Sequence, residues 1–465
     1  MTLFDPETFA GNTSAREPSG AGETAPVLRP IQYLGNKQRS LGTILSVIGS
    51  MVPNTGAVAD FFSGTSVVAQ GIASLGRRTI AVDVSPACAV IARATLGVGG
   101  ADVARDPQQL MAMLRDEAAG LEETLRAAWE PFLAAEDHAL ASGDGARLLE
   151  VGRLVPQVWR KLPSATSVSE LLAAWERSAS TGAECRSLLA PVFAGSYFSV
   201  RQAIDLDARR WAIASLAKQQ LLGPWDEAAL ITALLAAASV AAFSPGKHFA
   251  QPHRIDAGKD LTFHAGRALS DRAVSVPIVV DDWIEELYDR ARPAVERHTV
   301  LQKSVDEMSA DVLVAHGITA VYADPPYTAQ QYSRFYHVLD TLASGVPKQM
   351  QLVNGHVTTG LYPDGRYLSP FCSKRQARPA FTHLASLCRD ADASLLLSYS
   401  TSSKQSTGNA RMISLPALLD VLASRYGRDA IEIVEFDHQY RQFNHHDMAR
   451  MNREDPEVLV IAHAA

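Results

Sequence analysis

An acidic residue, two prolines and a tyrosine stand in a row at Asp324-Pro325-Pro326-Tyr327, directly after the apolar run Ala320 to Ala323. The prolines stiffen the turn and lack backbone N–H groups, while their carbonyl oxygens remain able to accept hydrogen bonds. A carboxylate beside a proline carbonyl offers two acceptors to an amino group, and the tyrosine ring offers a face for a planar base. Because α/β sheets bind ligands where strands end, these residues predict a catalytic site. The alternative is an ordinary Asp-Pro turn.

A second group of chemically suggestive residues is Asp60-Phe-Phe-Ser-Gly64-Thr-Ser66, which follows another apolar run. Gly64 permits a close approach of the backbone to a ligand at the start of a helix. Asp83 ends the next apolar run, where a carboxylate would bind ribose hydroxyls in a nucleoside-binding βαβ unit. These residues predict a nucleotide-like cofactor, although a plain glycine turn would look similar. The third group, Tyr33-Leu-Gly-Asn-Lys37, is uninformative by itself.

Together, the order of these three motifs resembles that of the Dam-like DNA amino-methyltransferases. Those enzymes transfer a methyl group from S-adenosylmethionine to the exocyclic amine of an adenine that is flipped out of DNA. The resemblance covers residues 31–96 and about 298–465. It implies a Rossmann-like class I methyltransferase sheet, S-adenosyl-L-methionine as the cofactor and double-stranded DNA as the substrate, with restriction or defence proteins as associated partners.

Carried over residue by residue, the resemblance assigns the tetrapeptide Asp324, Pro325, Pro326 and Tyr327 to catalysis. The cofactor would be bound by Tyr33, Lys37, Asp60, Phe62, Gly64, Asp83 and Asp306, with Asp311 as an alternative to Asp306. Ser66 departs from the family, which commonly has a glycine at that position. Its Cβ and hydroxyl would lie near the methionine part of the cofactor.

Basic and aromatic residues that follow the tetrapeptide predict contact with DNA. Residues 330–378 contain six Lys and Arg against two Asp, a net charge of +4 in a chain whose net charge is -7. Such a local patch suits phosphate contact, and aromatic and amide side chains suit base contact. The candidate DNA-binding residues are Gln331, Tyr332, Arg334, Lys374, Arg375 and Arg441. A solvated charged loop is the alternative explanation.

Apolar patterning indicates how these residues are positioned. Strands are expected at 58–62, 79–82, 299–302, 318–323, 394–399, 431–436 and 458–462, whereas 101–297 has helical patterning throughout. The fold class is therefore α/β, with a parallel sheet interrupted by a large, mainly helical insertion. We expect one catalytic domain from 27–100 and 298–465, with 101–297 as a target-recognition region. The composition of residues 1–26 predicts a disordered tail.

Composition excludes several classes of protein. The 465 residues are 47% hydrophobic and 20% charged, which suits a large globular core. The four cysteines form no CxxC pair, and the histidine-rich stretches 247–253 and 445–447 lack zinc-ligand spacing, so no metal is expected. The apolar run 228–243 is short for a membrane span and favours a buried helix. These features predict a cytoplasmic protein.

The predicted activity is therefore adenine N6 methylation of DNA. Three alternatives remain: methylation of the cytosine N4 amine, methylation of adenine in RNA, and a degenerate, non-catalytic DNA-binding homologue. Only Ser66 favours the last of these. The recognition sequence and the oligomeric state do not follow from the sequence.

Overall fold

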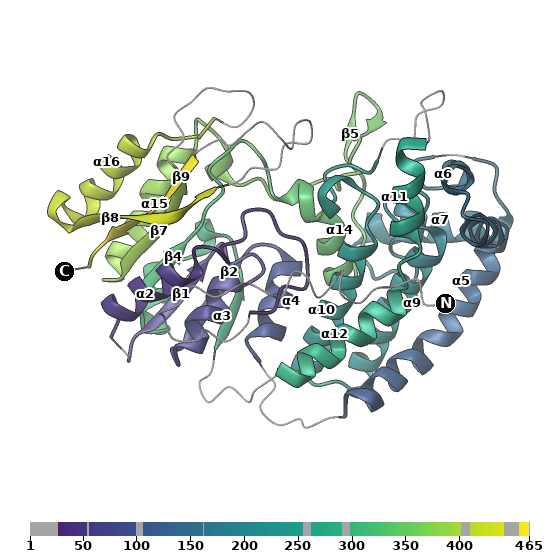
Figure 1. Ribbon diagram of the computed structural model, residues 1–465, viewed down its shortest axis with the longest axis horizontal. Coiled ribbons are helices and arrows are strands. Elements are labelled where there is room, and N and C mark those ends of the chain that lie inside the picture. Colours follow the sequence, from purple (N-terminus) through teal and green to yellow (C-terminus); the bar gives the residue numbers. More distant parts are fainter. Residues whose placement is uncertain are drawn as a thin grey trace.

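A sheet-based part and a helical part lie side by side in the protein (Figure 1). The computed structural model describes residues 27–53, 55–98, 106–160, 162–253, 262–290, 298–400, 410–440 and 455–464. The expected tail 1–26 lies outside these ranges. The sheet-based part is formed by chain segments from both ends of the sequence, with the helical part between them in the chain.

The central sheet has seven strands in the order β3-β2-β1-β4-β7-β9-β8. β1, β2, β3, β4 and β7 are parallel, and β9 runs antiparallel to both of its neighbours. The fold is thus α/β with a mostly parallel mixed sheet. The strands are β1 (Ala57–Phe61), β2 (Thr79–Asp83), β3 (Thr299–Gln302), β4 (Ile318–Ala323), β7 (Ser394–Ser400), β8 (Ile431–Tyr440) and β9 (Asp455–Ala462). A separate hairpin pairs β5 (Leu352–Val353) with β6 (His356–Val357).

Helices cover both faces of the sheet, as parallel strands require. On one face, Val58, Tyr322 and Leu459 pack with the apolar residues of α2 and α3. On the other face, Phe61 and Val321 pack with α13, α15 and α16. These helices and α4 are α2 (Leu41–Met51), α3 (Val67–Ser74), α4 (Pro86–Thr95), α13 (Ala310–Ala315), α15 (Ala377–Asp390) and α16 (Leu415–Tyr426).

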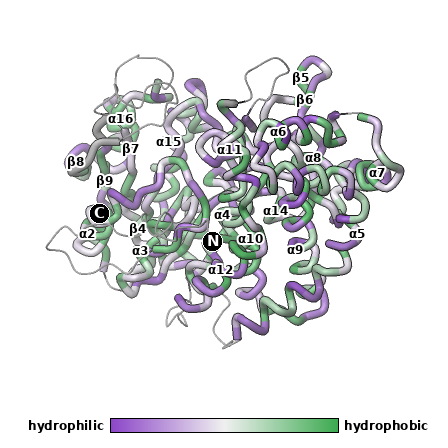
Figure 2. The backbone as a smooth tube through the Cα atoms, turned by 45° about the vertical axis from the view of Figure 1, so that its right-hand side comes forward, coloured by the Kyte–Doolittle hydropathy of each residue, from purple (hydrophilic) through white to green (hydrophobic). Residues whose placement is uncertain are grey.

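The helical part surrounds the alanine-rich helix α10 (Pro224–Ala241), which is apolar along its length (Figure 2). By length and composition this helix could cross a membrane, but 83% of its apolar window is buried inside the protein. It is therefore a core helix. Around it lie α5 (Pro107–Ala141), α6 (Gly145–Leu154), α7 (Thr166–Thr181), α8 (Ala190–Phe193), α9 (Val200–Lys218), η1 (Pro245–Lys247), α11 (Thr262–Arg272) and α12 (Val276–Arg290).

The helix α14 (Ser333–Ser344) follows the tetrapeptide and packs into the helical part, where Val338, Leu339 and Leu342 join the core around α10. The Asp340 carboxylate accepts hydrogen bonds from the Ser85 hydroxyl and the Ala87 N–H at the start of α4. The segment after the tetrapeptide therefore connects the two parts. Short 3-10 turns complete the elements: η2 (Val305–Glu307), η3 (Pro370–Cys372) and η4 (Arg428–Ala430).

Of two capping-box patterns in the sequence, one caps its helix and the other does not. Ser167 and Glu170 form a capping-box pattern, but α7 begins at Thr166, with Ala165 at the N-cap. By contrast, Ser199 and Gln202, which have the same spacing, form a capping box at the start of α9 with both reciprocal hydrogen bonds.

Candidate active site

The carboxyl ends of β1 and β4 lie side by side in the middle of the sheet. From β1 the chain continues to β2 on one side, whereas from β4 it continues to β7 on the other. The strand order thus reverses between β1 and β4, and such a reversal opens a crevice at the carboxyl ends of the strands. Asp60 and Asp324 occupy these two strand ends, so the first two predicted motifs are neighbours in space.

The third motif meets the tetrapeptide through a buried ion pair. Lys37 lies just before α2, and its Nζ is 2.9 Å from Asp324 Oδ2 and 2.7 Å from Glu457 Oε1. The Lys37 and Glu457 side chains are 6% and 2% exposed, but Asp324 is 20% exposed. Asp324 is thus the member of the trio that faces outward and can meet a ligand.

Burial and charge set the proton affinities of this trio. Burial raises the pKa of Asp324, Lys37 lowers it and the nearby Glu457 raises it, with a net pKa of about 6. Burial opposes charge on Lys37, but the two carboxylates outweigh this and hold the Lys37 pKa well above its usual value. Lys37 therefore stays protonated, and Asp324 can exchange a proton near neutral pH.

The loop after β1 has an unusual backbone. Phe62, Gly64 and Ser66 have left-handed φ angles of 60°, 52° and 60°. Non-glycine residues rarely adopt this conformation, and such strain concentrates at functional sites. A Cβ on Gly64 would lie 2.7 Å from Cε1 of Tyr33, so this glycine lets the first motif pack against the second. Tyr33 in turn stacks on Tyr336, with ring centroids 4.6 Å apart.

Two acids of the predicted cofactor site support this loop. Asp83 accepts hydrogen bonds from the N–H groups of Gly64 and Ser85, each at 2.9 Å. Asp60 is buried and accepts the N–H of Ala69 on α3, also at 2.9 Å. Burial raises the pKa of both carboxyls, and these hydrogen bonds counteract the rise. Asp60 therefore holds the helix behind the loop, a role that sequence reasoning did not assign to it.

The loop has polar atoms that suit a ligand. The hydroxyl oxygens of Ser63 and Ser66 are buried and have no hydrogen-bond partner among the residues that the structure describes. A buried polar atom without a partner costs free energy, about 1–3 kcal/mol, unless a ligand or water satisfies it. The hydroxyl of Ser66, which the family pattern does not contain, is therefore placed where it could bind such a ligand.

The remaining predicted cofactor residues lie further out. Phe62 packs edge-on against Phe371, with ring centroids 5.2 Å apart. Asp306 is exposed in η2, just beyond the carboxyl end of β3, and its charge contributes to the raised pKa of Tyr367. Asp311, the alternative acid, lies in α13 and is exposed. The position of Asp306 at the carboxyl edge fits the prediction better.

Tyr327 is largely covered in the structure. The residue is 8% exposed, and the guanidinium of Arg411 lies 4.7 Å from the ring centroid. Arg411 is fixed beside the ring because its guanidinium donates to the Ser400 hydroxyl and the Met412 N–H donates to the Tyr327 carbonyl. On the ring face that Arg411 covers, a base can stack only after Arg411 moves away.

The candidate DNA-binding residues divide into two groups. Gln331 exchanges two hydrogen bonds with the backbone of Ser369, and Tyr332 packs against Tyr33, so both have structural contacts. Arg334, Lys374 and Arg375 are exposed. Arg441 lies outside the described residues.

Lys374 and Arg375 lie just before α15, which runs back towards the amino end of β7. Their position is therefore at the carboxyl edge of the sheet, the edge that carries Asp324.

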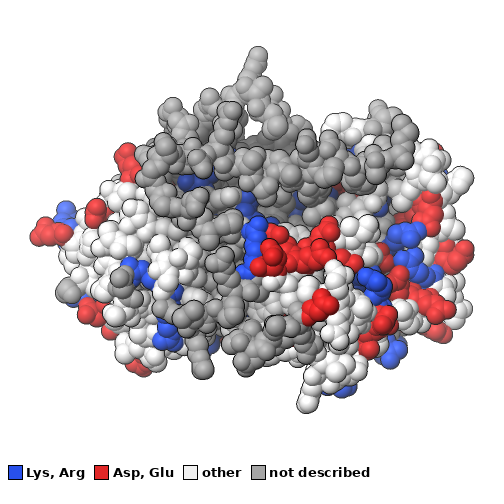
Figure 3. Space-filling model, turned by 60° about the horizontal axis from the view of Figure 1, so that its bottom comes forward, with Lys and Arg blue, Asp and Glu red and all other residues white. Residues whose placement is uncertain are grey.

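The surface of the helical part, seen from below, has acidic and basic side chains intermixed (Figure 3).

No family model matches the chain, and no curated protein matches it. The chemistry of the site must therefore be argued from its own geometry.

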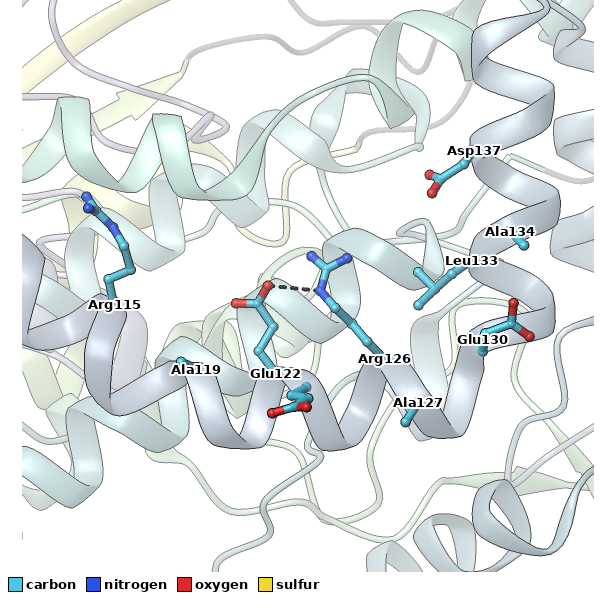
Figure 4. A pocket seen from close by; sticks show the side chains of 10 residues that line it. Arg115, Ala119, Glu122, Arg126, Ala127, Glu130, Leu133, Ala134 and Asp137 are labelled. Atoms are coloured by element: carbon cyan, nitrogen blue, oxygen red, sulfur yellow. Dashed lines mark hydrogen bonds and ion pairs between the residues drawn. The ribbon is translucent and has the colours of Figure 1, made fainter.

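Two further features bear on the choice of site. An open groove of about 740 Å³ runs along α5, far in sequence from the three motifs (Figure 4). Within its lining Arg126 pairs with Glu122 at 2.9 Å, and the groove contains none of the predicted site residues. Among the described residues, no group of three or more His, Cys, Asp or Glu could hold a metal ion.

Sequence reasoning missed Glu457 and Arg411. Glu457 had a visible signal, because an acid opens the apolar run 457–461, where a buried charge needs a partner. Arg411 had none, because its contact with Tyr327 depends on how the chain returns after β7.

Proposed function

We propose that this protein is a DNA adenine methyltransferase that transfers a methyl group from S-adenosyl-L-methionine to the N6 amine of a flipped adenine, in the cytoplasm. The observation that carries the proposal is the meeting of all three motifs at one sheet edge. Lys37 is 2.9 Å from Asp324, and the Tyr33 ring lies against Gly64. A chance turn at any one motif would not require the other two beside it.

The strand order also supports a Rossmann-like class I methyltransferase fold. Without β9, the sheet has the order of a doubly wound nucleotide-binding fold, 3-2-1-4-5-6 by sequence of strands. In that fold the ligand lies across the reversal point, beyond β1 and β4. The mainly helical insertion 101–297 is then available as the target-recognition region.

The loop 62–66 would hold the cofactor, with Asp83 beside it for the ribose and Asp306 near the adenine. The unpartnered hydroxyls of Ser63 and Ser66 fit a polar group such as the methionine end of the cofactor. Bound there, the sulfonium would supply an activated methyl group. We assign Ser66 to this contact, so the departure from the family does not argue for an inactive homologue.

Asp324 and the Pro325 carbonyl would accept hydrogen bonds from the two hydrogens of the adenine amine. Lys37 occupies Asp324 Oδ2, which leaves Oδ1 for the amine. The nitrogen lone pair of adenine is conjugated with the ring, so this amine is a poor nucleophile. Two acceptors favour its pyramidal form and stabilise the positive charge that develops on the nitrogen.

One transfer assay tests the proposal and its alternatives. The protein is incubated with radiolabelled S-adenosylmethionine and with duplex DNA or RNA, and the modified base is identified after digestion. We expect N6-methyladenine in DNA. N4-methylcytosine, label in RNA alone, or no transfer despite cofactor binding would each replace the proposal with the corresponding alternative.

A further inference from the structure

Glu457 is a buried acid at the catalytic edge of the sheet. Because β9 is antiparallel to β7, its first residues lie at the carboxyl end of β7, and Glu457 is opposite Ser400. Side chains alternate along a strand, so Glu457 shares a face with Leu459 and Ile461, which pack with α2. Lys37 lies just before α2, which explains why the two charges meet there.

Three oxygen atoms lie close to the Lys37 ammonium. Its Nζ is 2.9 Å from Asp324 Oδ2, 2.7 Å from Glu457 Oε1 and 3.4 Å from the Gly35 carbonyl oxygen. An ammonium has three donors and no acceptor, so this arrangement fixes its direction. Lys37 cannot turn away from Asp324 without leaving Glu457 buried and unpaired, which is costly.

We propose that Glu457 is a positioning residue for methyl transfer, acting through Lys37 to hold the Asp324 carboxylate in place and to keep it a proton acceptor. This inference rests on the proposed function. As the bond from nitrogen to the methyl carbon forms and the sulfur–carbon bond breaks, the amine nitrogen becomes positive. It then releases one proton to Asp324 Oδ1, which passes that proton to water after the product leaves. Lys37 remains protonated throughout because Glu457 supplies its second counter-charge.

The charged and titratable groups around Asp324 come from several elements. Lys37 contacts it from the α2 side, and the charges of Glu457 on β9, Asp60 on β1 and Tyr322 on β4 interact with it. Tyr327 acts on the same ammonium. Of these groups, Glu457 raises the pKa values of both Asp324 and Lys37. Neutralising Glu457 should therefore lower both.

The substitution Glu457→Gln tests this, because it keeps the shape and removes the charge. The wild-type rate should fall as the pH drops through the pKa of Asp324, at about 6. In the variant we expect the acid limb of the pH profile of kcat, which reports the protonation of Asp324, to move to lower pH by about one unit or more. A lower kcat with an unmoved acid limb would mean a merely structural role and would overturn the inference.

Glu457→Asp is the matched variant, because it keeps the charge and shortens the reach. We expect its kcat to fall while the acid limb of the pH profile stays in place. If either variant retains full kcat and the wild-type profile, Glu457 does not position Asp324. Thermal unfolding of both variants checks that the fold is intact.

An infrared titration makes the test independent of activity. The carbonyl band of protonated Asp324, assigned by its loss in Asp324→Asn, is followed against pH in the protein without DNA. We expect the midpoint to fall in Glu457→Gln, and an unchanged midpoint would overturn the inference. Absence of methyl transfer by the wild type, with the midpoint shift present, would instead reject only the proposed function.

Discussion

Asp324 is the residue on which methyl transfer should depend most. Asp324→Ala removes an acceptor of the amine hydrogens. Lys37 keeps its ion pair with Glu457 at 2.7 Å, so the buried ammonium still has a counter-charge. We expect kcat to fall by at least about 100-fold, a typical loss when one electrostatic stabiliser of a transition state is removed. Cofactor affinity should hardly change, because the 62–66 loop is intact. Single-turnover transfer and calorimetry measure the two effects.

The matched control for Asp324→Ala is Asp420→Ala, which changes an exposed acid on α16. It should leave both kcat and cofactor affinity as in the wild type. Turnover at the wild-type rate in Asp324→Ala would remove Asp324 from the mechanism, and with it the proposed use of the tetrapeptide.

Tyr327 should act through its ring rather than its hydroxyl. Stacking on an aromatic ring contributes about 1–3 kcal/mol per base, so Tyr327→Ala should weaken productive binding, whereas Tyr327→Phe should retain much of the activity. A DNA duplex with 2-aminopurine at the target position reports the stacking. Its fluorescence rises when the base leaves the duplex and is quenched by a stacked ring, so Tyr327→Ala should give a brighter complex than the wild type.

Arg411 adds a second expectation to the same assay. Because its guanidinium covers the Tyr327 ring at 4.7 Å, a flipped base has to displace it. Arg411→Ala uncovers the ring and should deepen the quenching of 2-aminopurine. Equal damage from Tyr327→Phe and Tyr327→Ala would show that the phenol hydroxyl matters, and the stacking role would be wrong.

At the scale of elements, the turn after β1 depends on Gly64. Alanine at a left-handed position costs about 1–2 kcal/mol, and here its Cβ would also lie 2.7 Å from the Tyr33 ring. Gly64→Ala should therefore lower both the free energy of unfolding and the affinity for S-adenosylmethionine. Gly76→Ala is a close control, because Gly76 also has a left-handed φ, 71°, but the Cβ of an alanine there would lie in open space.

The two glycine variants separate strain from binding. Both should lose stability in urea unfolding, but only Gly64→Ala should bind the cofactor more weakly in calorimetry. An equal affinity for the cofactor in both variants would place the cofactor away from this turn.

The parallel strands could be predicted from the sequence because each is a short apolar run between turn residues. Thr299–Gln302 and Ile318–Ala323 have the predicted bounds. The insertion of antiparallel β9 between β7 and β8 could not be predicted, because it depends on long-range pairing. For the same reason the sequence indicated Lys37 and Asp324 as site residues but not Glu457. The Lys37 ammonium lies between the carboxylates of Asp324 and Glu457.

At the scale of the whole molecule, α14 couples the catalytic edge to the helical part. It begins soon after Tyr327, and its apolar side enters the core around α10. Asp340 on this helix also caps the start of α4, directly after the strand that carries Asp83. DNA bound by the helical part would thus act on a helix that is fixed to both the catalytic and the cofactor motifs.

The overall charge of the molecule makes a prediction about how DNA is bound. The net charge of -7 repels DNA at long range, so binding must come from local cations such as Lys374 and Arg375. Each phosphate that the protein neutralises contributes about 0.9 to the slope of log affinity against log salt concentration. The double variant Lys374→Ala/Arg375→Ala should therefore bind DNA more weakly and reduce that slope by up to about 2.

Arg428→Ala provides the matched control, because Arg428 is an exposed arginine in η4 next to the amino end of β8, the opposite edge of the sheet. Arg428→Ala also removes positive charge from the protein, but it leaves the cations at the catalytic edge in place. Titrations of a fluorescent duplex at several salt concentrations should give the wild-type slope for Arg428→Ala. If this control reduces the slope as much per charge as the double variant does, net charge governs binding, and DNA does not lie across the carboxyl edge.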